Sequence, residues 1–201
     1  MDGRGEPEML VTNAALPGIL LIRPVRHCDS RGFFAEIFRE DLFRRHGISV
    51  HFVQENFSLS ESANVIRGLH FQIPPFAQAK LIRVTSGAIL DIAVDLRWGS
   101  PSYGKYAATL LTADTEDQLF VPEGFAHGFR TLEPNTGVEY RVNCYYSREH
   151  DRGLLWSDPE LAIDWQLSGE TPLVSERDRR HPVLAELPSF FSYQSLMASC
   201  G

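Results

Sequence analysis

The stretch VIRGLHFQ (65–72), with QAKLIRV (78–84) and AILDIAVDL (88–96) after it, decides the fold of this chain. The three runs are rich in β-branched and aromatic residues, and segments containing Pro and Gly separate them. Short runs of this composition, bounded by turn residues, are typical of β-strands in a sandwich or barrel. The centre of the sequence therefore predicts an antiparallel β-structure.

Further runs of the same kind extend this pattern in both directions. They are ILLIRPV (19–25), FFAEIF (33–38), HFVQENFSL (51–59), YAATLLT (106–112), QLFVP (118–122), HGFRTL (127–132) and VEYRVNCYY (138–146). Two segments are expected to be helical: EDLFRRHG (40–47), which ends at a glycine suited to a cap, and a tail over 181–198. The sequence predicts one all-β domain over residues 1–180, with short flanking helices and a C-terminal tail, 181–201, packed on it.

Composition excludes several classes of function. A formal net charge of −7 argues against a general nucleic-acid binder, which needs a basic surface to meet phosphate. No apolar run approaches the length of a membrane span, and the acidic first ten residues, broken by Gly and Pro, do not resemble a secretory signal. Cys28, Cys144 and Cys200 are odd in number and widely spaced, which predicts neither a disulfide framework nor a CxxC metal site. We expect a cytoplasmic protein with no membrane or nucleic-acid partner.

Two motifs resemble the halves of the cupin signature, G-x5-H-x-H-x3-4-E-x6-G and P-x-G-x-x-H. The first is RGLHFQ (67–72) with Lys80 and Gly87, and the second is PEGFAH (122–127). In cupins two histidines, the glutamate and the last histidine converge on a metal inside a jelly-roll barrel. Here Gln72 stands in place of the second histidine and Lys80 in place of the glutamate. A protonated amine has no lone pair and repels a dication, so the resemblance predicts a jelly-roll barrel without a bound metal.

The residues left in this pocket suit proton transfer next to a ketone. An imidazole from His70 or His127 can take up a proton at physiological pH. The Lys80 ammonium can stabilise the oxyanion that forms when carbon next to a ketone loses a proton. Return of a proton to the other face is epimerisation, and it needs a second proton carrier such as a phenol. Taken singly, each residue is more simply read as structural; the joint spacing is what indicates an active site.

Longer blocks extend the resemblance from about Gly18 to about Pro182. The chain resembles the dTDP-4-dehydrorhamnose 3,5-epimerase family in DSRGFFAEIF (29–38), FVQENFSLSE (52–61), VIRGLHFQ (65–72), QAKLIRV (78–84), LDIAVDLRWGSPSYGKY (90–106), QLFVPEGFAHGF (118–129), YRVNCYY (140–146), GLLWSDPELAIDW (153–165) and SERD (175–178). The blocks are collinear, so the resemblance is specific. It departs at Arg177, where members often carry Lys.

The resemblance implies a role for each matching residue. His70 is expected to be the general base, oriented by Asp178, and Tyr140 the proton donor on the opposite face. Lys80 is expected to stabilise the enolate at the C4 oxygen. The expected substrate-binding residues are Arg67 at the pyrophosphate, Phe34 and Glu36 at the thymine with Arg31 close by, and Gln54, Asn56 and His127 along the sugar and phosphates. The family implies no cofactor, and a homodimer in which the N-terminal strands reach the neighbouring subunit's site.

The expected reaction inverts C3 and C5 of dTDP-4-dehydro-6-deoxy-D-glucose to give dTDP-4-dehydro-L-rhamnose. An epimerase acting only at C3 or only at C5 of a related sugar carries the same motifs, so it stays open. Gln72 and Lys80 disfavour a metal-dependent cupin dioxygenase or isomerase. The joint presence of His70, Lys80, Tyr140 and Asp178 disfavours a non-catalytic cupin that only binds sugar nucleotides.

Overall fold

The computed structural model describes residues 9–193, which consist almost entirely of short β-strands. The strands are β1 Leu10–Asn13, β2 Leu20–Arg23, β3 Arg26–Asp29, β4 Gly32–Ala35, β5 Gln54–Ser60, β6 Val65–Gln72, β7 Lys80–Ser86, β8 Ala88–Asp95, β9 Arg97–Trp98, β10 Tyr106–Thr112, β11 Gln118–Val121, β12 Phe125–Thr131, β13 Thr136–Val142, β14 Asp151–Gly153, β15 Leu173–Val174 and β16 Phe191–Ser192. One α-helix, α1 (Glu40–Arg45), falls within the expected 40–47. Each expected strand run contains a strand, so the all-β prediction is confirmed.

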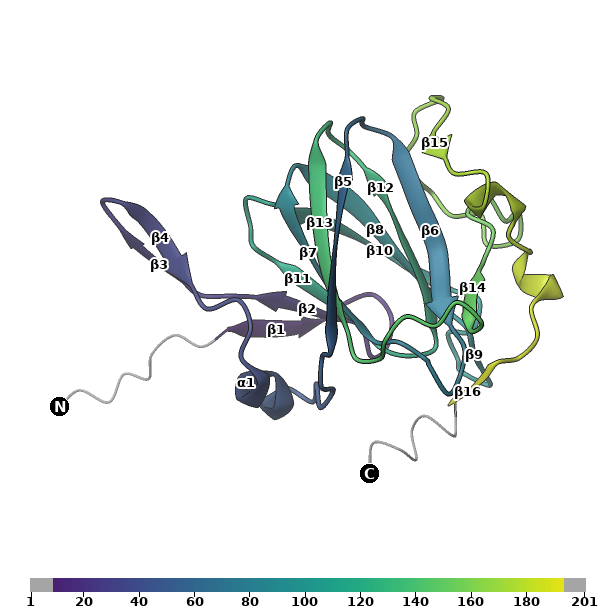
Figure 1. Cartoon of the computed structure of the whole chain (residues 1–201), viewed down its shortest axis with the longest axis horizontal. Helices are drawn as coiled ribbons and strands as arrows, with labels where there is room; N and C mark the ends of the chain where they lie inside the picture. The colour runs from purple at the N-terminus through teal and green to yellow at the C-terminus, as the bar shows by residue number, and fades with distance from the viewer. Residues whose placement is uncertain (1–8, 194–201) are drawn as a thin grey trace.

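Two sheets face each other as a jelly roll (Figure 1). The first has the strand order β1-β2-β11-β7-β13-β5, and the second has the order β10-β8-β12-β6-β14 with β15 added beside β6. Nearly all neighbours within the sheets are antiparallel; β15 and β6 are parallel. Short strands such as β9, β14 and β15 were missed in the sequence, because two or three residues do not make a readable alternation.

Strand β8 shows how the layers are built, because every one of its residues is buried. Side chains alternate along a strand, so Ile89 and Ala93 join the apolar cluster between the sheets, while Leu90 and Ile92 join a cluster on the outer face. The same alternation directs Asp91 to the space between the sheets. This strand therefore carries a carboxylate into an otherwise apolar interior.

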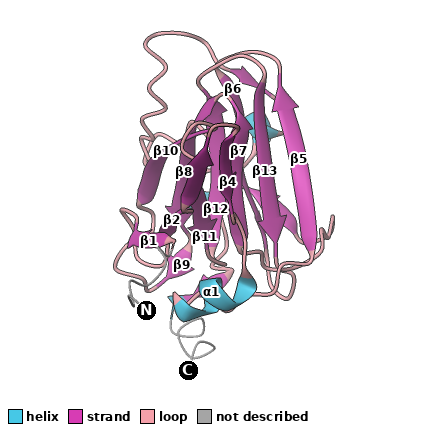
Figure 2. Cartoon of the chain, turned by 90° about the vertical axis from the view of Figure 1, so that its left-hand side faces the viewer, coloured by secondary structure: helices cyan, strands magenta, loops and turns pink. Residues whose placement is uncertain are grey.

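Different segments cover the outer faces of the two sheets. The segment after β13 lies over the second sheet, where Leu154, Trp165 and Phe191 pack in its outer cluster (Figure 1). Helix α1 covers one end of the first sheet with Leu42 and Phe43 (Figure 2). Each such large apolar side chain contributes about 2–3 kcal/mol when it is removed from water. These apolar contacts thus hold the covering segments on the outer faces of the two sheets.

The tail differs from its prediction. Within 181–193 the structure has a 3-10 turn at Leu184–Glu186 and the two-residue strand β16, not an α-helix; the rest of the expected helix, 194–198, lies outside the described residues. Pro188 explains the difference, because a proline disfavours the helical conformation of the residue before it and removes a backbone donor. The carbonyl of Pro182 accepts a hydrogen bond from the Leu155 amide, and Phe191 is buried.

The hairpin β3–β4 stands apart from the barrel and extends away from it (Figure 1). Phe33 and Phe34 on this hairpin are 49% and 70% exposed. Arg26 lies over the Phe33 ring, yet both aromatic side chains still leave apolar surface open to solvent on a projecting hairpin. No helix in that range has the length and apolar character needed to span a membrane.

Candidate active site

A bulge in β6 turns two functional side chains toward the same space. His127 of β12 lies opposite His70, and Phe129 lies opposite Arg67, so three residue steps on β6 match two on β12. Gly68 sits in the bulge with a φ of +127°, and a Cβ there would lie 2.6 Å from the Gly128 Cα. In a regular strand Arg67 and His70 would point to opposite faces. The bulge lets both line one cavity.

The cavity between the sheets has a volume of about 510 Å³. His70, Arg67 and His127 come to it from the second sheet, and Lys80 and Tyr140 come from the first. An adjoining cavity of about 340 Å³ shares His70, Lys80 and Tyr140 and is lined further by Gln54 and Asn56. The structure therefore brings together eight of the eleven predicted site residues: His70, Asp178, Tyr140, Lys80, Arg67, His127, Gln54 and Asn56.

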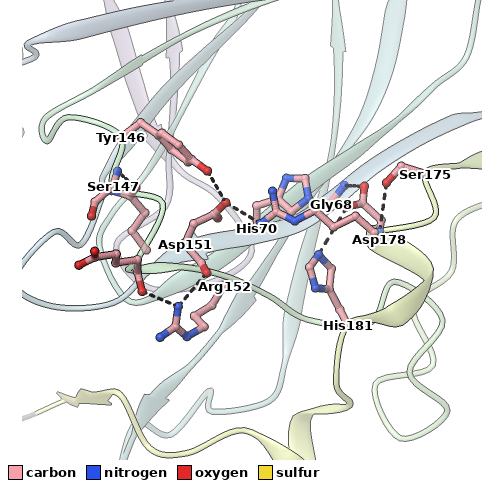
Figure 3. A network of polar contacts seen from close by, with 12 residues as sticks. Gly68, His70, Tyr146, Ser147, Asp151, Arg152, Ser175, Asp178 and His181 are labelled. Carbon is pink, nitrogen blue, oxygen red and sulfur yellow. Dashed lines mark hydrogen bonds and ion pairs between the residues drawn. The ribbon is translucent and has the colours of Figure 1, made fainter.

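His70 is paired with Asp178, as Figure 3 shows. Nε2 of His70 lies 2.8 Å from Asp178 Oδ1, and the Gly68 amide donates to Oδ2 at 3.1 Å. Burial opposes ionisation of Asp178, but its contacts with His181 and His70 outweigh burial and hold the pKa of this carboxyl well below its usual range. Asp178 is therefore an anion that fixes the orientation of the His70 ring.

Lys80 enters the cavity from the start of β7. It is only 8% exposed, and its Nζ donates to the His70 carbonyl at 3.2 Å. Burial lowers the pKa of Lys80 to about 8, although the charges of Asp91 and Asp151 oppose this shift. The side chain is thus mostly cationic at neutral pH and close to losing its proton above it.

Tyr140 and Arg67 face the cavity from opposite sheets. Burial raises the pKa of Tyr140, Arg67 opposes that rise, and Asp151 adds to it, so the phenol keeps its proton at neutral pH. Arg67 is held at its base, where Nε donates to the Ser60 hydroxyl at 3.1 Å and a terminal nitrogen donates to the Leu59 carbonyl at 3.2 Å. The remaining guanidinium donors can meet an anion.

His127 forms a second pair, with Asp91. Its Nε2 lies 2.8 Å from Asp91 Oδ2, and both side chains are buried. Burial lowers the pKa of His127, and the positive charges of Lys80 and His70 add to this, while Asp91 opposes it. His127 is therefore a neutral hydrogen-bonding wall of the cavity.

Several residues at the site were missed in the sequence. Asp151 accepts from the Tyr146 hydroxyl at 3.0 Å (Figure 3). It also forms an ion pair with Arg177, with 2.5 Å between Oδ2 and the guanidinium nitrogen. Asp91 and His181, beside the two predicted histidines, were missed as well. Asp151, within REHDRG, and His181, within RDRRHP, read as solvated loop residues, so no signal pointed to them. Asp91, in the predicted strand AILDIAVDL, did carry a signal, since it is a carboxylate in an otherwise apolar run.

Three predicted residues do not reach the cavity of this chain. Arg31 and Phe34 lie on the projecting β3–β4 hairpin, where Arg31 pairs with Asp29 at 2.6 Å. Glu36 follows the hairpin, and its Oε1 lies 3.4 Å from the Arg39 guanidinium. None of the three lines either of the two cavities described above.

One group among the described residues has metal-ligand spacing. The candidate donor atoms of His70, Asp178 and His181 lie within 4.8 Å of one another. Since His70 Nε2 and Asp178 Oδ1 already face each other at hydrogen-bond distance, we assign no metal to this group. Gln72, at the position of the second histidine in the cupin signature, has other contacts: its amide nitrogen donates to the Phe76 carbonyl at 2.7 Å, and its amide oxygen accepts from the Ser147 amide.

Chemically, the arrangement can move protons across a small substrate. A carboxylate-oriented imidazole on one sheet faces a protonated phenol on the other, with an ammonium beside them. A ketone held between the sheets can lose an adjacent proton to the imidazole and regain one from the phenol.

The comparisons with known proteins agree on one family. A family model described as dTDP-4-dehydrorhamnose 3,5-epimerase matches residues 13–186. A dTDP-4-dehydrorhamnose 3,5-epimerase of Sinorhizobium fredii is 48% identical over 193 residues, which cover 96% of this chain and 98% of that protein.

Solved structures give the same result. A dTDP-4-dehydrorhamnose 3,5-epimerase of Bacillus anthracis with TDP and PPi bound is 46% identical, with a TM-score of 0.84 over 87% of this chain and 99% of that one. A dTDP-6-deoxy-D-glucose-3,5-epimerase of Legionella pneumophila in complex with dTDP-4-keto-L-rhamnose is 36% identical, with a TM-score of 0.88 over 93% and 100%.

Proposed function

The chain belongs to the dTDP-4-dehydrorhamnose 3,5-epimerase family, and we propose that it inverts C3 and C5 of dTDP-4-dehydro-6-deoxy-D-glucose through the cavity between its sheets. It is an isomerase, as its relatives are. The observation that carries the mechanism is the placement of His70 and Tyr140 on opposite walls of one cavity. Inversion needs proton removal from one face and delivery to the other, which two facing sheets provide.

His70 is the general base in this proposal. In the neutral ring, Nε2–H donates to Asp178, which leaves the lone pair of Nδ1 to accept the proton next to the C4 ketone. The anionic Asp178 then stabilises the imidazolium that forms, as the carboxylate does in other His–Asp pairs.

Lys80 and Tyr140 complete the transfer. The Lys80 ammonium stabilises the enolate oxygen at C4, where its effect is large because it is almost fully buried. Tyr140 delivers its hydroxyl proton to the opposite face of the sugar. The same two groups serve C3 and C5, because both carbons neighbour the same ketone.

Substrate binding uses the remaining polar lining. We assign the pyrophosphate to Arg67, whose guanidinium faces the cavity. Gln54 and Asn56, joined by a 2.8 Å hydrogen bond, and the neutral His127 hold the sugar and phosphates. A volume of about 510 Å³ is ordinary for a small-molecule site.

The test is incubation with dTDP-4-dehydro-6-deoxy-D-glucose in heavy water, followed by NMR at C3 and C5. We expect deuterium and inverted configuration at both carbons. Inversion at one carbon alone would make the chain a single epimerase, and binding without exchange would make it a sugar-nucleotide-binding protein.

We further propose a homodimer in which the β3–β4 hairpin completes the neighbouring subunit's site. In support, Phe34 is 70% exposed on a hairpin that projects from the barrel, and Arg31 lies beside it. Strand β5 also turns Gln54, Asn56 and Ser58 toward the cavities and leaves Phe57 and Leu59 at least half exposed. A partner subunit would cover both apolar surfaces.

Mixed dimers test this arrangement. Phe34→Ala and His70→Asn variants are each expected to be nearly inactive as pure proteins. Mixing and reassociating them would create one site with an intact hairpin from one subunit and an intact base from the other, so activity should reappear. Mixtures that stay as inactive as their components would place each complete site within one chain.

Two further expectations remain proposals: that the protein binds no metal, and that it is cytoplasmic. The position of Lys80 disfavours a dication, so activity should survive dialysis against EDTA; about one transition metal per chain with activity lost on chelation would refute this. Cys28 and Cys144 are free thiols, which suits a reducing compartment.

A further inference from the structure

His181 is a buried imidazole behind the His70–Asp178 pair, and none of the roles assigned so far includes it. Its Nε2 lies 3.4 Å from Asp178 Oδ1, the same oxygen that His70 meets at 2.8 Å. Its ring stands edge-on to the His70 ring, with centroids 5.7 Å apart (Figure 3). The side chain is only 11% exposed.

The surroundings of His181 are built to accept its ring. Gly153 of β14 lies against it so closely that a Cβ on Gly153 would come within 2.2 Å of His181 Nε2. The ring is therefore wedged between β14 and the turn that carries Asp178. Nε2 has no hydrogen-bond partner within residues 9–193, and a buried polar nitrogen without a partner is costly. Asp178 Oδ1, 3.4 Å away, is an acceptor that a small shift of the ring would bring into hydrogen-bond geometry.

We propose that His181 is a positioning residue that donates its Nε2–H to Asp178 Oδ1, so that one carboxylate oxygen is shared by two imidazoles. The proposal rests on His70 being the base. Sharing holds the carboxylate in place from the side away from the substrate. It also divides the negative charge of that oxygen between two donors, so that less of it acts on the proton that His70 acquires.

Other titratable and charged groups also surround His70, and a test of His181 must leave them unchanged. The Lys80 ammonium bonds the His70 carbonyl, His127 lies across the strand pair, and Asp151 with Arg177 forms the rim of the adjoining cavity. His181 itself does not line either cavity within the described residues, so its replacement should leave substrate binding intact.

The test compares His181→Leu, which removes the donor, with His181→Gln, whose amide can reach the same position. In His181→Leu, the acid limb of the kcat/KM profile should move to higher pH by roughly 0.5–1 unit, because Asp178 then acts on His70 alone. At optimal pH, kcat should fall about 3–10-fold with KM unchanged. His181→Gln should restore both. A matched control is His150→Leu, which removes a part-buried imidazole bonded to Ser147 instead.

An unmoved acid limb in His181→Leu, or equal effects of Leu and Gln, would overturn the proposal. Nitrogen-15 NMR of the unmodified protein gives a second measurement that needs no variant. At neutral pH, the His181 ring should be protonated at Nε2; an unprotonated Nε2 contradicts the proposal directly. This NMR measurement does not depend on catalysis. It therefore tells apart two outcomes: that His181 does not position Asp178, and that His70 is not the base.

Discussion

Two imidazole–carboxylate pairs lie at the cavity, His70–Asp178 and His127–Asp91. The distance between nitrogen and oxygen is the same in both, but the exposure of the imidazole and the origin of the carboxylate differ. His70 and His127 lie opposite each other on β6 and β12, and each ring nitrogen is 2.8 Å from a carboxylate oxygen. The His70 side chain is 36% exposed, whereas that of His127 is 7% exposed. Asp178 begins a 3-10 turn, Asp178–Arg180, far along the chain, whereas Asp91 comes from β8, the strand beside β12.

This difference separates the pair that transfers protons, His70–Asp178 (the working pair), from the pair that supports the cavity wall, His127–Asp91 (the supporting pair). Burial lowers the pKa of His127 and makes it a poor proton acceptor, and one oxygen of Asp91 has no hydrogen-bond partner within residues 9–193. His70 is open to substrate, while its carboxylate receives the Gly68 amide on its second oxygen. The histidine of a His–Asp pair can therefore act as a base when substrate can reach its ring and both oxygens of its carboxylate are hydrogen-bonded. The distance between the nitrogen and the oxygen alone does not decide this.

Exchanging each histidine for asparagine is the strongest way to break the comparison. His70→Asn should lower turnover by roughly 10⁴-fold and abolish deuterium uptake at C3 and C5, because no other group takes the proton. His127→Asn should lower turnover only about tenfold, because it removes a hydrogen-bonding wall. Both effects are read in one heavy-water NMR assay. Loss of exchange in His127→Asn with exchange retained in His70→Asn would reverse the two roles.

The carboxylates sharpen the same contrast. Asp178→Asn should slow turnover by roughly 10²–10⁴-fold with little change in thermal stability, because the imidazolium loses its partner and the ring its preferred tautomer. Asp91→Asn should instead lower the free energy of unfolding by about 1–3 kcal/mol, since it leaves a buried hydrogen bond imperfect in the core. Thermal melts and steady-state rates of the two variants test this. Equal stability losses would mean that both pairs are structural.

The sequence predicted the working pair better than the supporting one. RGLHFQ and SERD carry enough family-specific pattern to name His70 and Asp178, although 108 positions separate them. Asp91 was missed because a carboxylate in an apolar run gives no indication of its partner. The bulge at Gly68 was also missed, since it appears only when β6 is aligned with β12. Local patterns predict strands, whereas cross-strand register decides which side chains meet.

Replacing the proposed donor tests whether His70 acts without its counterpart on the other sheet. Tyr140→Phe keeps the ring but deletes the hydroxyl proton. His70 should still form the enolate and return a proton to the face it came from, after exchange with solvent. Recovered substrate should then gain deuterium while inverted product falls by roughly 10²-fold. Equal losses of exchange and inversion would mean that Tyr140 helps to form the enolate, and undiminished inversion would make Tyr146 or a water the donor.

The smallest expected effect comes from Lys80, whose charge acts on His127 and whose Nζ donates to the His70 carbonyl. Burial lowers the pKa of Lys80 to about 8, against the charges of Asp91 and Asp151. The protonated amine is the active form, so turnover should fall above pH 8, about tenfold for each further unit. Asp91→Asn removes one of the charges that favour the ammonium and should move this basic limb of the pH–rate profile to lower pH.

Lysine-selective carbon-13 NMR can follow the titration of Lys80 directly, because Lys105 is the only other lysine in the sequence and Lys105→Met identifies its signal. A basic limb that stays in place in Asp91→Asn would mean that the buried pair does not support the Lys80 charge, and that its contribution to the site is packing alone.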